Sequence, residues 1–209
     1  TDDSDVEGNE AAIFDLANVA SNNANVSIGA ASSATLTIQD NDVVIPAIII
    51  SEVADPNDNA NGRFVELYNA TDSTVDLAAG SWHLTKFVNN NSSRTSVALT
   101  GTIAPGATYV IGGSGFNATY DPLTADQTWN DATANGDDTY ALYYGGDNTS
   151  GTLVDILGVI GTDGTGQEWN YEDGRAVRKA DVTSPDDSLF ASDWIFYSDE
   201  SSSNQPLTN

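Results

Sequence analysis

The 209-residue sequence contains no cysteine, no methionine and only one histidine. The absence of cysteine excludes disulfide bonds and thiolate metal sites, so we expect side-chain burial alone to stabilise the fold. A single imidazole cannot build a zinc site, and no Ser and Asp spacing around His83 indicates a catalytic triad. We expect His83 to make a surface or cross-strand contact. Because the chain has no initiator methionine, we expect residue 1 to be an internal position of a longer precursor.

Basic residues are also scarce, with 6 Lys and Arg against 31 Asp and Glu and a formal net charge of −25. A nucleic-acid-binding protein needs basic surface to neutralise phosphate, so we expect no nucleic-acid partner. No apolar run reaches about 18 residues, so we expect no membrane insertion. A chain rich in Asp, Asn, Ser, Thr and Gly is typical of proteins that work outside cells. The composition therefore predicts an extracellular or cell-surface location.

The acidic residues are mostly aspartate, since only 7 of the 31 are glutamate. Aspartate suits tight turns and loops that bind hard cations, whereas glutamate would have favoured helices. Apolar residues alternate with polar ones in many short runs, and no stretch of ten residues follows the helical period of 3.6. The sequence therefore predicts an all-β fold with little helix.

Residues 1–42 form a separate unit in this prediction. Residues 12–16 alternate as in a half-buried strand, residues 26–28 form a short strand, and residues 34–38 place Leu36 and Ile38 on one face. About three strands cannot cover both faces of a sandwich, so their apolar face needs a partner. That cover could be the larger domain, a neighbouring copy of the chain or sequence upstream of this segment.

The acidic loop ending in Glu7-Gly8-Asn9-Glu10, together with the later Ala34-Thr35-Leu36-Thr37-Ile38 and Asp40-Asn41-Asp42, resembles the closing part of a Calx-β domain. Ala12 stands where that family usually has Phe, and Asn41 replaces an acidic residue. The resemblance implies a Ca²⁺ site whose carboxylates are those of Asp2, Asp3, Glu7, Glu10, Asp40 and Asp42. The alternative is a solvated acidic loop that keeps only half of the family's site.

A linker at residues 43–47 precedes a larger domain that we place at residues 48–198, followed by a polar tail at residues 199–209. This domain contains Ile48-Ile49-Ile50-Ser51-Glu52-Val53, then Phe64-Val65-Glu66-Leu67-Tyr68-Asn69, then Trp82-His83-Leu84. An Ala104-Pro105-Gly106 turn leads into Tyr109-Val110-Ile111. These motifs resemble the lamin tail domain family of bacterial and archaeal secreted proteins, which implies an Ig-like β-sandwich.

Residues 117–138 form a long polar insertion that contains Tyr120 and Trp129. We expect these aromatic residues to pack and to order the insertion. The loop from Asp55 to Gly62 alternates possible oxygen ligands, but it lacks the glycine at the sixth position and the glutamate at the twelfth position of an EF-hand. It is therefore interpreted as a turn.

Two groups of charged residues have more than one interpretation. Glu52 and Glu66 could form a catalytic pair of carboxylates, as in glycosidases, whereas the family resemblance implies structural positions at strand ends. The basic cluster of Arg175, Arg178 and Lys179 could dock on the acidic surface of another copy. Alternatively, one of its arginines pairs with a local carboxylate or stacks on Trp194.

The function that we predict is non-catalytic, since no constellation of residues supports an enzyme. The chain is interpreted as an extracellular structural or interaction module, stabilised by Ca²⁺, whose incomplete N-terminal strands complete a sheet in a neighbouring copy. The alternative is an accessory binding module of a larger secreted enzyme, for example a nuclease or phosphatase in the same precursor.

Overall fold

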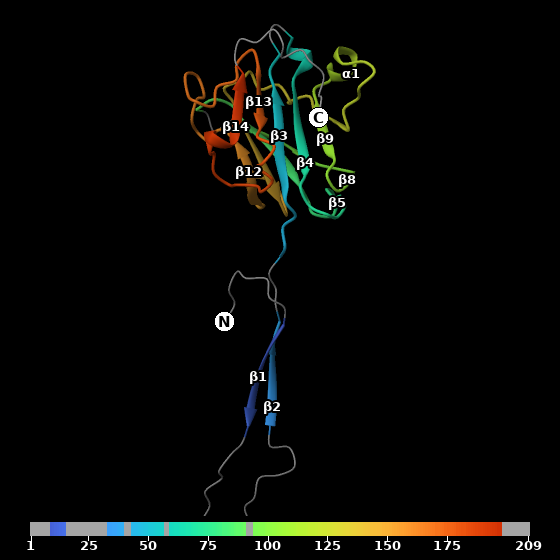
Figure 1. Cartoon of the computed structure of the whole chain (residues 1–209), viewed down its shortest axis with the longest axis vertical. Helices are drawn as coiled ribbons and strands as arrows, with labels where there is room; N and C mark the ends of the chain where they lie inside the picture. Colours follow the sequence, from blue (N-terminus) through green and yellow to red (C-terminus); the bar gives the residue numbers. More distant parts are fainter. Residues whose placement is uncertain (1–8, 16–32, 40–42, 57–58, 91–93, 198–209) are drawn as a thin grey trace, which may run out of the picture. The chain divides into compact units, whose positions relative to one another are not determined.

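The structure, a computed structural model, describes residues 9–15, 33–39, 43–56, 59–90 and 94–197. The chain divides into two units, residues 1–45 and residues 46–209. Strands are the main regular secondary structure of the described chain (Figure 1), and helix there is confined to α1 (Phe116–Thr119) and two 3-10 turns, η1 (Ala60–Gly62) and η2 (Ala191–Asp193). The prediction of an all-β fold is confirmed. No helix within the described ranges is long and apolar enough to cross a membrane.

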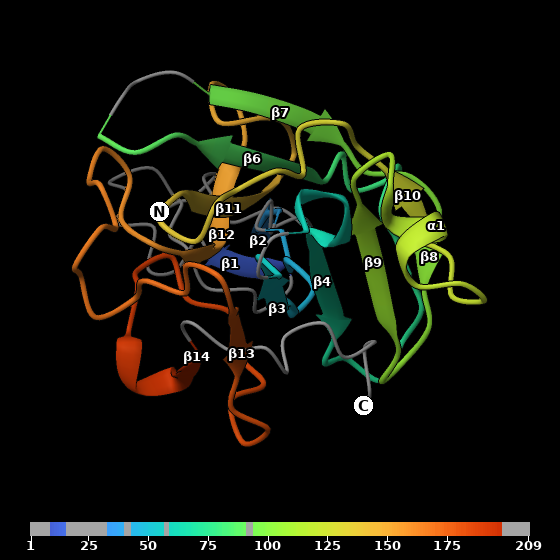
Figure 2. The same ribbon diagram turned by 90° about the horizontal axis from the view of Figure 1, so that it is seen from above.

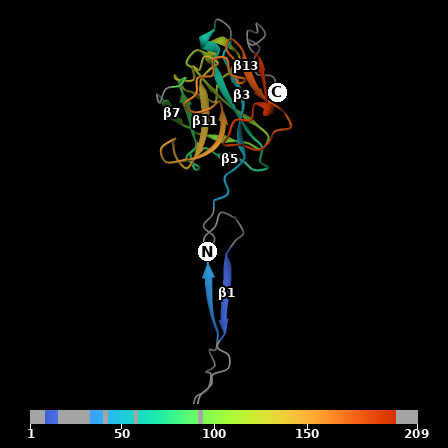
Figure 3. The same cartoon turned by 90° about the vertical axis from the view of Figure 1, so that its left-hand side faces the viewer.

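The described part of the N-terminal unit is an antiparallel pair of strands, β1 (Glu10–Asp15) and β2 (Ser33–Ile38), shown side by side in Figure 3. In its register Ala12 lies opposite Leu36 and Phe14 lies opposite Ala34. Alternation therefore places Phe14, Leu36 and Ile38 on one face. Of the predicted strands, the one at residues 26–28 lies outside the described residues.

The second unit contains a six-stranded sheet in the order β10-β9-β4-β3-β13-β14. Neighbouring strands are antiparallel except β10 and β9, which are parallel. Because β13 pairs directly with β3, the last part of the chain returns to the strand that opens this unit. The strands in chain order are β3 (Ile48–Ala54), β4 (Phe64–Asn69), β9 (Thr108–Gly112), β10 (Gln127–Thr128), β13 (Arg175–Arg178) and β14 (Trp194–Tyr197).

A four-stranded antiparallel sheet in the order β12-β11-β6-β7 forms the other layer of this unit, as Figure 2 shows. A further short pair joins β5 (Val75–Asp76) to β8 (Thr102–Ile103). Both sheets contribute fully buried side chains to the sandwich, among them Ile50, Leu67, Leu84 and Tyr140. The strands of the four-stranded sheet are β6 (His83–Phe87), β7 (Arg94–Ala98), β11 (Thr139–Tyr144) and β12 (Thr152–Leu157).

The predicted ordering of the insertion by its aromatic residues is confirmed. Tyr120 and Trp129 are both buried. Tyr120 and Phe116, from α1 and its end, pack on Phe64 at the outer face of the six-stranded sheet. The Tyr120 hydroxyl also donates a hydrogen bond to the Gly62 carbonyl (3.0 Å). These contacts close one end of the outer face of this sheet.

A β-bulge at Ser51 decides which side chains of β3 face outward. The pairing of β3 with β4 sets Ile50 opposite Leu67 but Glu52 opposite Glu66, so Ser51 has no partner of its own. Without the bulge, alternation would place Glu52 on the same face as Ile50, toward the core. The extra residue instead moves Glu52 to the outer face, beside Glu66.

Candidate functional site

The outer face of the six-stranded sheet contains a cavity of about 370 Å³, which we call the Glu52–Glu66 cavity. Residues of β3, β4 and β13 form its floor, and the segment 179–183 forms one wall. Its lining residues are Ile49, Ser51, Glu52, Glu66, Tyr68, Gly106, Val177, Arg178, Lys179, Ala180, Val182 and Thr183. Carboxylates and apolar side chains therefore share one small cavity.

The two carboxylates of this cavity come from directly opposed residues. Glu52 and Glu66 form a cross-strand pair, and their exposed fractions are only 7% and 2%. The expectation that they lie at strand ends is wrong, because both occupy interior positions of their strands. Like charges directly opposite in an antiparallel pair repel one another, so these side chains need partners that offset the repulsion.

Two different groups bind the carboxylates. Arg175 donates to Oε1 of Glu52 (3.2 Å), and the Ser51 hydroxyl donates to Oε1 of Glu66 (2.7 Å). Burial raises the pKa of Glu52 to about 7, Arg175 opposes this increase, and the charge of Glu66 adds to it. Near neutral pH Glu52 therefore takes up a proton easily.

Arginines of the basic cluster were expected, as one alternative, to bind groups of their own domain, and this is confirmed for both Arg175 and Arg178. Besides its bond to Glu52, Arg175 lies over the ring of Tyr197, with 5.1 Å from Cζ to the ring centroid. Arg178 pairs with Asp155 and lies 4.3 Å over Trp194. Lys179 is exposed, and its Nζ donates to the Ser192 carbonyl (2.5 Å). Both guanidinium groups are thus held inside the domain.

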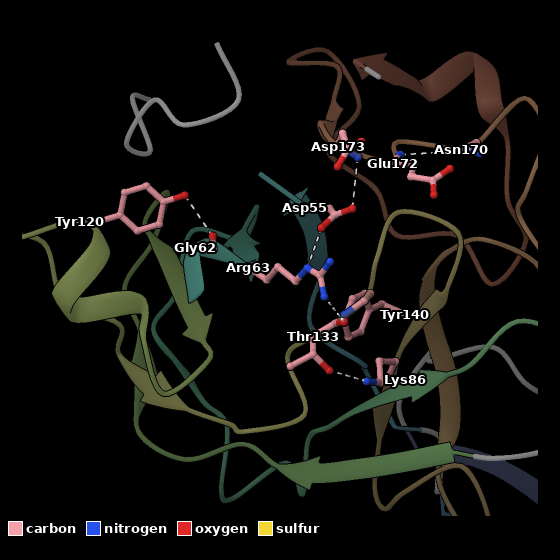
Figure 4. A network of polar contacts seen from close by, with 11 residues as sticks. Asp55, Gly62, Arg63, Lys86, Tyr120, Thr133, Tyr140, Asn170, Glu172 and Asp173 are labelled. Atoms are coloured by element: carbon pink, nitrogen blue, oxygen red, sulfur yellow. Dashed lines mark hydrogen bonds and ion pairs between the residues drawn. The ribbon is translucent and has the colours of Figure 1, made fainter. Parts of the chain in front are cut away.

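A second polar network lies around Asp55, as Figure 4 shows. Arg63 donates to Oδ1 of Asp55 (2.6 Å), and the backbone N–H of Asp173 donates to its Oδ2 (3.2 Å). Arg63 also donates to the Thr133 carbonyl (3.1 Å), and Lys86 donates to the Thr133 hydroxyl (2.8 Å). These bonds tie the start of the loop after β3 to distant segments, which is a structural role.

His83 is half-buried at the start of β6, opposite Tyr143 on β11. Its Nδ1 lies 3.0 Å from the Ser81 carbonyl oxygen. Its side-chain contact is therefore local, with the residue two positions earlier, while Tyr143 is its neighbour across the sheet.

Most of the carboxylates implied for Ca²⁺ binding, namely Asp2, Asp3, Glu7, Asp40 and Asp42, lie outside the described residues. Glu10 is the exposed first residue of β1, opposite Ile38. Nowhere in the described ranges do three acidic or histidine side chains gather as a group that could hold a metal ion.

Sequence reasoning missed the cavity because it did not anticipate the bulge at Ser51. The one signal in the sequence is the glutamate at position 52, which interrupts an otherwise apolar strand. Such a residue needs a buried partner, and this requirement could have indicated pairing with a later arginine.

The comparison with known families agrees with this architecture. The lamin tail domain model matches residues 41–161, which is more than half of the chain. No curated protein matches the chain. The match begins after the strand pair of the N-terminal unit, so it concerns the sandwich. From this match and the two-layered β fold, the chain belongs to the lamin tail domain family.

Proposed function

We propose that this chain is a non-catalytic structural module of the cell exterior, which self-associates through its N-terminal strands. The observation that carries the proposal is the exposed apolar face of the β1–β2 pair. Phe14 and Leu36 lie on this face and are 61% and 56% exposed. In the described part of the chain neither strand pairs with a third strand.

An isolated pair of strands is at best marginally stable in water. Its two edges present unpaired N–H and C=O groups, and its apolar face is open to solvent. A strand added from another chain pairs the open edge through main-chain hydrogen bonds, and it covers the apolar side chains at the same time.

A second copy of the same chain is the partner that we propose, since every copy carries the same incomplete pair. We infer that the pair is the closing part of a Calx-β-like unit, in which an exchange of strands between copies restores a fuller sheet. Such exchange between identical chains needs no new complementary surface. The apolar face that is exposed in one copy then covers that of the next.

Ca²⁺ belongs to the same proposal, because a net charge of −25 opposes contact between copies. We propose that Ca²⁺ binds the carboxylates of Asp2, Asp3, Glu7, Glu10, Asp40 and Asp42. The register supports this assignment, since Glu10 lies opposite Ile38, at the end of the pair where the chain enters β1 and leaves β2. Ca²⁺ at that end would offset the repulsion between copies.

Light scattering of the whole chain tests this proposal, with Ca²⁺, then with a chelator, and with Mg²⁺ at the same ionic strength as the control. We expect a mass above 21.9 kDa in Ca²⁺ that returns to the monomer value after chelation. A monomer under all three conditions contradicts self-association and favours an accessory module of a secreted enzyme. Equal association in Mg²⁺ and Ca²⁺ contradicts a specific Ca²⁺ site.

A further inference from the structure

The Glu52–Glu66 cavity contains one carboxylate oxygen that is open to a ligand. Oε1 of Glu52 accepts from Arg175, whereas Oε2 accepts no hydrogen bond within the described residues. Glu52 as a whole is only 7% exposed. Its Oε2 still reaches solvent, unlike the indole nitrogens of Trp82 and Trp194, which are sealed in the core. Oε2 therefore offers an acceptor at the cavity surface, where an O–H group of a ligand can meet it.

Tyr68 supplies a second free polar group in the same cavity. It lies on β4 and is half-buried, and its hydroxyl makes no hydrogen bond within the part of the chain that the structure describes. Its cross-strand neighbour is Ile49, which also lines the cavity. Gly106 has no side chain that could fill the space beside the hydroxyl, since a Cβ there would lie 3.8 Å from the hydroxyl oxygen. An aromatic ring and a hydroxyl that can donate or accept thus lie next to apolar surface.

The charges around the cavity favour a neutral ligand over an ion. Glu52 and Glu66 line it with carboxylates. Arg178 and Lys179 line it as well, and Arg175 binds Glu52. An added cation would meet guanidinium and ammonium groups, and an added anion would meet carboxylates. A neutral ligand avoids both kinds of repulsion, and its hydroxyl groups form strong hydrogen bonds to a charged acceptor.

The apolar part of the cavity indicates a ring-shaped ligand. Ile49, Val177 and Val182 line it beside the polar groups, and Val177 lies directly opposite Glu52 on the neighbouring strand. A hexose in its pyranose form has C–H groups on the faces of its ring and hydroxyl groups around the edge, so one molecule can meet both kinds of surface. The volume of about 370 Å³ lies at the lower end of the range for small-molecule sites, roughly 300 to 1,000 Å³, which favours a single ring.

We infer that the Glu52–Glu66 cavity binds a single neutral hexose ring. One hydroxyl of the sugar donates to Oε2 of Glu52, another forms a hydrogen bond with the Tyr68 hydroxyl, and the C–H groups of the ring lie against Ile49 and Val177. Binding involves no covalent step. The cavity belongs to the sandwich and the β1–β2 pair does not, so hexose binding and self-association can fail separately.

The test titrates the whole chain with the methyl glycosides of glucose, galactose and mannose, and follows backbone amide signals by NMR. The titrations are run at about pH 8, because the pKa of Glu52 is about 7 and its carboxyl group is then mainly ionised. We expect at least one glycoside to shift the signals of Val177 and Val182, with a Kd of about 1 mM, which is typical of so small a ligand. Sorbitol carries similar hydroxyl groups on an open chain and should bind about tenfold more weakly, because it loses internal rotations on binding.

A hexose ring can come from a free sugar or from the end of a glycan. The free sugars are therefore titrated beside their methyl glycosides, which have the linkage of a glycan end. Tighter binding of the glycosides assigns the cavity to the end of a glycan, and tighter binding of the free sugars assigns it to a monosaccharide. Either result supports hexose binding.

Variants locate the binding. Glu52→Gln should weaken it about tenfold, because the amide oxygen stays with Arg175 and an NH₂ group replaces the acceptor at Oε2. Tyr68→Phe removes only a hydroxyl group and should weaken binding about fivefold. Tyr144→Phe removes the same group from a half-buried tyrosine of the four-stranded sheet and should change the affinity less than about twofold. Tyr68→Phe keeps the test decisive if Glu52→Gln does not fold.

Three outcomes overturn the inference. The first is that none of the sugars shifts the signals of Val177 and Val182 at concentrations up to about 20 mM, well above the expected Kd. The second is an equal loss of binding in Tyr68→Phe and Tyr144→Phe, which would place the binding outside the cavity. The third is equal binding of sorbitol and the glycosides, which would indicate a general attraction of polyols to the protein surface.

Discussion

Arg178 and Asp155 form a buried ion pair that joins the two sheets of the sandwich. Nη2 of Arg178 lies 2.5 Å from both carboxylate oxygens of Asp155, which is on β12, and neither side chain is more than 4% exposed. The same two side chains form hydrogen bonds with the backbone of Ile50, next to the bulge in β3. The Ile50 N–H donates to Asp155 (2.7 Å), and Arg178 Nε donates to the Ile50 carbonyl (3.3 Å). The pair thus satisfies backbone groups next to the residue that turns Glu52 outward.

We expect Arg178→Met to lower the free energy of unfolding by about 3 to 5 kcal/mol, because it leaves Asp155 buried without its cation. Urea denaturation measures this change. Lys179→Met is the matched control, since Lys179 is the exposed neighbour, and its change should stay within about 0.5 kcal/mol. Similar values for the two variants would contradict the role assigned to Arg178.

The raised pKa of Glu52 makes stability depend on pH. The folded state holds the proton of this group more tightly than the unfolded state, so stability falls as pH rises from 4.5 to about 7. Glu52→Gln removes this dependence. We expect the variant to gain about 2 kcal/mol relative to the wild type between pH 5 and pH 8.

Unfolding free energies of both proteins at the two pH values measure this difference. Glu168→Gln, which removes an exposed carboxylate, should follow the wild-type profile. A constant difference between wild type and Glu52→Gln across the range would show that Glu52 does not titrate in this window.

The two faces of the β1–β2 pair allow a direct test of self-association. Leu36→Asp places a charge on the apolar face, whereas Thr37→Asp places the same charge on the opposite face. We expect Leu36→Asp to abolish the Ca²⁺-dependent increase in mass and Thr37→Asp to retain it. Light scattering measures both, and equal loss in the two variants would indicate simple charge repulsion.

Alanine substitutions at Gly136 and Gly161 distinguish the effect of backbone strain from the effect of steric contact. Both have positive φ, +89° and +79°, so alanine is strained by roughly 1 to 2 kcal/mol at either position. A Cβ at Gly136 would lie 2.2 Å from Cα of Glu172, whereas nothing lies within 4 Å of a Cβ at Gly161. We expect Gly136→Ala to destabilise the protein by about 1 to 3 kcal/mol more than Gly161→Ala. Urea denaturation gives the difference, and equal effects would contradict the close approach at Glu172.

The sequence by itself determined that the chain is built from strands and, where no bulge intervenes, which side chains share a face, because side-chain alternation is a local property of an extended chain. Leu36 and Ile38 were correctly placed on one face, and the aromatic residues of the insertion at Tyr120 and Trp129 were correctly expected to pack. The motifs from Ile48 onward also indicated the family. For Arg178, pairing with a local carboxylate and stacking on Trp194 were foreseen as alternatives, and both occur.

Only the tertiary structure decided which carboxylate Arg178 meets and where Glu52 points. Asp155 is 23 positions away from Arg178, and the two meet because their strands lie in facing sheets. Glu52 lies beside Glu66 because one extra residue, Ser51, shifts the alternation of β3 against its partner strand. Register and bulges depend on hydrogen bonds between distant segments, and local periodicity carries no information about those bonds.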